Sequence, residues 1–125
     1  MKSENNVLCV SNSYLKKYYF NPIFDSIPSL VKDELKSLCV LFTEDVGGVL
    51  IFKYNDNLKL EIVSYMFDND IYYDEVGALL KIKKIKNEKS ELIRYLEKYY
   101  KLVIKGENDV TSNWYWQHKY SFWSF

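Results

Sequence analysis

The stretch from residue 49 to residue 67 constrains the fold more than any other part of the chain. Two strand-like runs, Val49–Tyr54 and Leu58–Phe67, are separated only by the turn-forming residues Asn55-Asp56-Asn57. Asn and Asp tolerate the left-handed backbone geometry that tight hairpin turns require. From Leu58 to Ile62 apolar and charged side chains alternate, which is typical of a strand with one buried and one wet face. The pattern predicts a β-hairpin that must be covered on one side.

An amphipathic helix is predicted before this hairpin. Pro28 suits a first helical position, where a missing N–H costs nothing. From there apolar residues recur at intervals that place them mostly on one helical face, namely Leu30, Val31, Leu35, Leu38 and Phe42. We expect the helix to end near Asp45, because Gly47-Gly48 is a stop signal.

A second, Lys-rich helical segment is predicted after the hairpin, over Tyr73–Ile104. Asp68-Asn69-Asp70 is expected to form a turn and to cap the helix start. Apolar spacings of three and four residues continue from Ile82 to Val103, interrupted by Lys89. The segment is either one long helix or two helices with a break near Asn87. We interpret its apolar seam as packing against the hairpin sheet, with a coiled-coil dimer as the alternative.

These elements define an α+β fold class. Val7–Val10 and Lys16–Phe20 are further strand-like runs. We therefore expect a small antiparallel sheet with a central β-hairpin, packed against the amphipathic helix and the long Lys-rich helix. Residues 1–106 form the single domain of this interpretation, and residues 107–125 form a separate aromatic-rich segment.

Several classes of protein are disfavoured by the residues present. No run approaches the about 18 consecutive apolar residues of a membrane-spanning helix, and no secretory signal is recognisable, so we expect a cytoplasmic protein without membrane contact. The two cysteines, Cys9 and Cys39, lie in apolar surroundings and are expected to be buried, inert thiols. With one His and two Cys in the chain, we expect no metal site and no cofactor.

The charges are segregated along a chain whose formal net charge is zero. Residues 25–80 carry a net −7, whereas residues 81–105 carry a net +6. Sixteen of the 17 basic residues are Lys, which together with the many Asn, Ile and Tyr residues indicates an A+T-rich bacterial or phage genome. On a helix, Arg94, Lys98, Lys101 and Lys105 share one face. This basic stripe is either a site for an anionic partner or a solvated face offset by nearby Glu residues.

The last twelve residues contain seven aromatic side chains. An exposed aromatic segment of this kind would promote aggregation, so we expect it to dock. Docking as an extra strand on the protein's own sheet is the preferred interpretation. A partner surface, including a second copy of the chain, and a stacking platform for sugars or bases are the alternatives. The candidate partner-binding residues are accordingly Trp114, Trp116, Tyr120, Trp123, Arg94, Lys98 and Lys101.

Three motifs resemble those of a known family. They are Lys32-Asp33-Glu34-Leu35 with the following Cys39–Gly48, then Tyr73–Gly77, and then Leu80–Lys83. Together they are similar to a family of small proteins from low-GC Gram-positive bacteria that is known only as a domain of unknown function. The resemblance extends over about Val7–Gly106 and implies no activity, ligand or catalytic residue.

Three functional hypotheses follow. The first is a non-catalytic cytoplasmic interaction protein that binds another protein, or itself, through the aromatic segment and the basic helix face. The second is a nucleic-acid-associated factor in which phosphates are bound by Lys83, Lys86, Arg94, Lys98 and Lys101, and Trp or Tyr side chains stack on bases. The third is an enzyme that uses carboxylates of Glu44, Asp45 or Asp74, with Tyr72 or Tyr73 as the acid.

Overall fold

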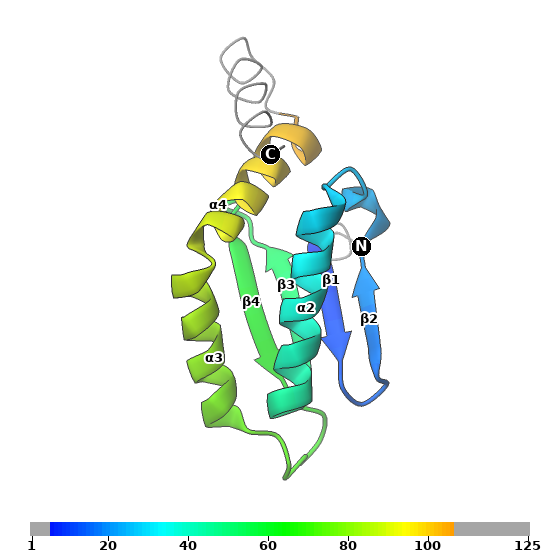
Figure 1. Ribbon diagram of the computed structural model, residues 1–125, viewed down its shortest axis with the longest axis vertical. Coiled ribbons are helices and arrows are strands. Elements are labelled where there is room, and N and C mark those ends of the chain that lie inside the picture. Colours follow the sequence, from blue (N-terminus) through cyan, green and yellow to red (C-terminus); the bar gives the residue numbers. More distant parts are fainter. Residues whose placement is uncertain (1–5, 107–125) are drawn as a thin grey trace.

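A four-stranded antiparallel sheet is the centre of the structure, a computed structural model that describes residues 6–106 (Figure 1). Two hairpins make up the sheet, and its strands lie in the order β2-β1-β3-β4. Helix α2 connects the hairpins, and α3 and α4 follow the second one. The strands are β1 (Val7–Asn12), β2 (Lys17–Phe20), β3 (Val49–Tyr54) and β4 (Leu60–Tyr65). The helical elements are η1 (Pro22–Phe24), α2 (Ser29–Val46), α3 (Glu75–Glu88), α4 (Ser90–Tyr99) and the π-helical turn η2 (Tyr100–Ile104). The expected α+β class is confirmed.

The predicted hairpin is present as β3 and β4, with Phe52 opposite Ile62. Its turn differs in detail from the expectation, because the left-handed residue is Leu58, with φ +62°, and not an Asn or Asp. The reason lies in Asn55, whose side-chain oxygen accepts hydrogen bonds from the N–H groups of Asn57 and Lys59. The Asn55 side chain thus holds residues 55–57 in a local turn, and the left-handed backbone conformation falls on the next residue, Leu58.

Helix α2 crosses one face of the sheet and supplies much of the core (Figure 1). It starts after Pro28, as expected, and buries Val31, Leu35, Cys39 and Phe42. Leu30 is an exception to the predicted apolar face, since 82% of it is exposed. Gly48 is required where α2 turns into β3, because a Cβ there would lie 2.5 Å from the Tyr65 carbonyl oxygen.

The Lys-rich segment is divided into α3 and α4, which agrees with the alternative of a break near Asn87. The break occurs at Lys89, whose Nζ lies 3.0 Å from Glu34 Oε2 on α2. The expected cap at Asp68-Asn69-Asp70 is wrong, because Asp74 caps α3 by accepting a hydrogen bond from Gly77 N. Asp70 instead accepts from Tyr72 N and from the hydroxyl of Tyr14.

The end of α4 is fixed to the sheet by aromatic packing. The ring of Tyr100, in η2, stacks on Tyr54 of β3 with 3.8 Å between ring centroids. The Tyr54 hydroxyl donates a hydrogen bond to the Leu96 carbonyl oxygen at 3.0 Å. Most of the apolar seam of the Lys-rich segment therefore faces the sheet, and Leu92, Leu96 and Tyr99 are buried.

The aromatic segment lies outside the described residues, as do its candidate residues Trp114, Trp116, Tyr120 and Trp123. Its expected docking as a strand therefore stays a prediction. Among the described residues, the core cluster extends from Leu8 to Tyr100.

Candidate functional site

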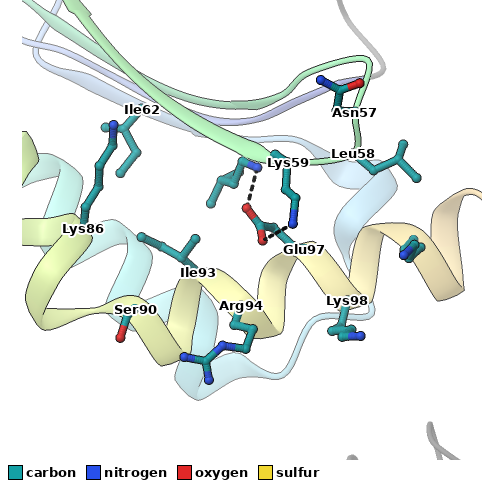
Figure 2. Close-up of a pocket in the computed structure, with 12 residues that line it drawn as sticks. Asn57, Leu58, Lys59, Ile62, Lys86, Ser90, Ile93, Arg94, Glu97 and Lys98 are labelled. Atoms are coloured by element: carbon teal, nitrogen blue, oxygen red, sulfur yellow. Dashed lines mark hydrogen bonds and ion pairs between the residues drawn. The ribbon is translucent and has the colours of Figure 1, made fainter.

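A hollow of about 580 Å³ lies between β4 and the α3–α4 pair (Figure 2). One wall is the outer edge of β4 with the turn before it, and the other is α4 with the end of α3. This volume is within the range of natural ligand sites. We call this hollow the basic groove because basic residues predominate among the charged residues that line it.

Five of the residues that line the groove are basic and one is acidic. The acidic residue is Glu97, and the basic residues are Lys59, Lys86, Arg94, Lys98 and Lys101. The structure therefore brings the three sequence-predicted residues Arg94, Lys98 and Lys101 together at one site. Lys105, the fourth member of the predicted stripe, instead places its Nζ 5.5 Å from the centre of the Tyr100 ring.

Helix α4 contributes side chains to the groove from two of its sides. Ile93 and Glu97 point from α4 toward β4, whereas the side chains of Arg94 and Lys98 extend away from the strand (Figure 2). Residues three and four apart lie on one side of a helix, so Ile93 and Glu97 share one side and Arg94 and Lys98 another. Arg94 and Lys98 thus lie on the outer border of the groove, while Ile93 and Glu97 lie on its inner side.

Four aliphatic side chains, which we call the apolar floor, also line the groove. Leu58, Leu60 and Ile62 come from the turn and strand β4, and Ile93 comes from α4. None of the twelve described residues that line the groove is aromatic. The groove therefore combines apolar contact with positive charge, and its described residues offer no ring on which a nucleobase would stack.

The edge of β4 presents backbone groups to the groove. Asn55 N donates to Lys59 O, whereas Tyr54 N donates to Asn6 O on the other side of β3. Hydrogen-bonded and non-hydrogen-bonded pairs alternate in an antiparallel ladder. Leu60 and Ile62, opposite Tyr54 and Phe52, thus direct their N–H and C=O groups away from β3.

Glu97 is hydrogen-bonded to the first of these outward-facing backbone groups, the N–H of Leu60. Its Oε2 accepts a hydrogen bond from Leu60 N at 2.9 Å, and its Oε1 lies 3.9 Å from Lys59 Nζ. The Glu97 side chain is 21% exposed, so this contact is largely shielded from solvent. For the N–H of Ile62 no hydrogen-bond acceptor is found among the described residues.

A second hollow, of about 690 Å³, lies between the β1–β2 hairpin and α2. Lys16, Lys17 and Lys36 surround it, and all three are exposed. The hydroxyls of Ser11 and Thr43 at this site are already bonded to each other at 2.8 Å. This hollow collects fewer charges than the basic groove and includes no residue of the predicted basic stripe.

The residues proposed for an enzyme lie near the end of α2 and just before α3, and three of them already have contacts there. Asp45 pairs with Lys81, Asp74 caps α3, and the Tyr73 hydroxyl is bonded to Ser64. Tyr72 is 87% exposed. Within residues 6–106, no group of three or more His, Cys, Asp or Glu side chains is arranged to hold a metal ion.

Sequence reasoning did not identify Lys59 or Glu97 as parts of a site. Lys59 was assigned only to the wet face of a strand, and Glu97 only to a helix surface. The alternation of apolar and charged residues places Lys59 in the hairpin. The sequence does not show which helix packs against the start of β4, because that depends on tertiary packing.

In the described part of the chain, no helix has the length and apolar character needed to cross a membrane.

Comparison with known proteins supports the resemblance seen in the sequence motifs. No curated protein and no solved structure matches the chain. The sequence model of one family, of unknown function, matches residues 5–108, which include every strand and helix described above and all the residues of the basic groove. The chain therefore belongs to the family of unknown function DUF6145.

Proposed function

We propose that this protein is a non-catalytic interaction module that binds an acidic segment of a partner protein in the basic groove. The observation that carries this proposal is the lining of the groove, which combines five basic side chains with one Glu and four aliphatic side chains. Complementary charge steers and orients a partner, while the apolar floor contributes burial. An acidic polypeptide segment that also carries apolar side chains satisfies both features.

A nucleic acid fits the groove less well. Single-stranded nucleic acid is usually held by a positive track together with aromatic rings that stack on the bases. The groove offers the first feature without the second, and Glu97 would face the phosphates. Only Arg94 among its bases has the forked guanidinium that binds phosphate in two places.

The proposal includes a cytoplasmic location in a bacterium with an A+T-rich genome. Support comes from Cys9 and Cys39, which are free thiols with 3.8 Å between their Sγ atoms. Two thiols this close remain reduced most readily in the cytoplasm. The preference for Lys over Arg supports the composition of the genome.

The test is a binding titration with the full chain and a fluorescein-labelled peptide of alternating Glu and Val, followed by fluorescence anisotropy. We expect binding that weakens as the salt concentration rises, because salt screens exposed charges. The double variant Arg94→Glu/Lys101→Glu should bind at least about tenfold more weakly. The matched control is Lys83→Glu/Lys84→Glu, which changes the net charge equally at exposed positions of α3 outside the groove.

Equal loss of binding in the two double variants would show that only net charge matters, and it would overturn the proposal. So would tighter binding of an oligothymidine of the same charge. Circular dichroism of each variant verifies that the fold is retained.

A further inference from the structure

The edge of β4 offers more than a wall for the basic groove. Leu60 and Ile62 direct backbone N–H and C=O groups into it, and the N–H of Ile62 has no acceptor among the described residues. A second extended chain placed about 4.8 Å from β4 would exchange hydrogen bonds with these groups. Such strand addition is a common way for a sheet edge to bind a peptide.

An added strand would also fit the chemistry of the groove. Alternate side chains of a strand point to opposite faces of the sheet. On the side covered by α4 they would meet the aliphatic side chains of Ile93 and Leu58, and the bases at the strand side of the groove are Lys59 and Lys86 (Figure 2). The occupant is therefore a segment in which apolar and acidic residues alternate.

Glu97 stands where this strand must enter. Its carboxylate accepts the hydrogen bond of Leu60 N at 2.9 Å, which is the bond that a carbonyl oxygen of the incoming strand would accept. The same carboxylate repels an acidic segment. In the free protein Glu97 thus accepts the hydrogen bond of Leu60 N, and it would compete with an incoming strand for this N–H.

We propose that the basic groove takes an extended acidic segment of a partner protein as a fifth strand on β4, and that Glu97 is displaced from Leu60 when this strand binds. The inference rests on the proposed function and specifies its binding mode. It predicts two properties that charge attraction alone does not produce: a dependence on the backbone of the peptide and a competing role for Glu97.

The first experiment examines the peptide backbone. A series of the Glu/Val peptide carries one N-methyl group at each position in turn, which removes a single N–H donor. Binding to the full chain should fall about tenfold for methylation at positions of one parity and stay nearly unchanged at the other, since only alternate N–H groups face β4. If the peptide binds through the lysines but parity has no effect, strand addition is wrong while the proposed function stands.

The second experiment examines Glu97. Glu97→Gln keeps an acceptor for Leu60 N but removes the charge, and we expect it to tighten peptide binding by about threefold. Glu97→Ala also frees the N–H and should tighten binding further. The control Glu91→Gln changes the same charge at an exposed position of α4 outside the groove and should have less effect.

Two outcomes would overturn this binding mode. One is weaker peptide binding in Glu97→Gln with an unchanged thermal denaturation midpoint, which would make Glu97 a ligand contact. The other is a gain of more than about tenfold on deletion of residues 107–125. That gain would identify the protein's own C-terminal segment as the occupant of the groove.

Discussion

At the scale of single residues, the two cysteines show how packing changes chemistry. Cys9 of β1 and Cys39 of α2 are fully buried, and their Sγ atoms are 3.8 Å apart. The hydrogen-bonding contact with Cys9, together with burial, raises the pKa of the Cys39 thiol well above its ordinary value. A raised pKa leaves less thiolate at any given pH, and the thiolate is the reactive form.

Because both thiols are fully buried and the pKa of Cys39 is raised, we predict that neither thiol of the native protein reacts readily with Ellman's reagent at about pH 8. Both should react within the mixing time in concentrated urea. The measurement is the absorbance of the released thionitrobenzoate. Rapid modification of the folded protein would show that the contact between β1 and α2 opens frequently.

At the scale of elements, the start of α3 is set by a single side chain. Asp74 accepts a hydrogen bond from Gly77 N, and its own N–H donates to Val46 O at the end of α2. The residue therefore caps one helix and joins it to another. Because α3 leads directly to the break at Lys89, the placement of α4 along β4 depends on this start.

Replacing Asp74 with Ala should lower the free energy of unfolding by about 1 kcal/mol, the usual cost of losing a side-chain cap. Urea denaturation followed by circular dichroism measures the change. Asp68→Ala is the control, because Asp68 is exposed in the preceding turn and has the same charge. A larger loss at Asp68 than at Asp74 would contradict this assignment of the cap.

At the scale of the whole molecule, the acidic and basic halves of the sequence partly neutralise each other. Lys81 pairs with Asp45, and Lys89 pairs with Glu34, so two ion pairs join α2 to the Lys-rich segment. These pairs are partly exposed, and pairs of this kind contribute about 1 kcal/mol at most. The buried apolar cluster from Leu8 to Tyr100 is therefore the main source of stability.

We predict that a chain truncated to residues 1–106 still unfolds in one cooperative transition, because the described core residues, from Leu8 to Tyr100, all lie within that range. Urea denaturation of the truncated and full chains checks this. Light scattering of both chains tests the aromatic segment as a contact between copies: self-association of the full chain that disappears on truncation would support it. Loss of cooperative unfolding would contradict the boundary at residue 106.

Local patterns were sufficient to predict most elements of the fold. The alternation in β4, the glycines after α2 and the spacing of the helical seams each depend on nearby residues, so the strands and helices follow from the sequence. The cap at Asp74 was missed because Asp68, Asp70 and Asp74 are equally good caps by residue type, and the tertiary bond to Val46 selects among them. The groove was half predicted: helical periodicity grouped Arg94, Lys98 and Lys101, but the approach of α4 to β4, and hence the roles of Lys59 and Glu97, depends on packing.

The contact between Glu97 and Leu60 also has a consequence for solubility. An open strand at the end of a sheet is a template on which identical chains join edge to edge. Here the carboxylate blocks one backbone donor of β4, and Lys59 and Lys86 put positive charge beside this edge in both copies of any such junction. Like charges at that distance repel, so the arrangement that would admit an acidic segment discourages a filament of this chain.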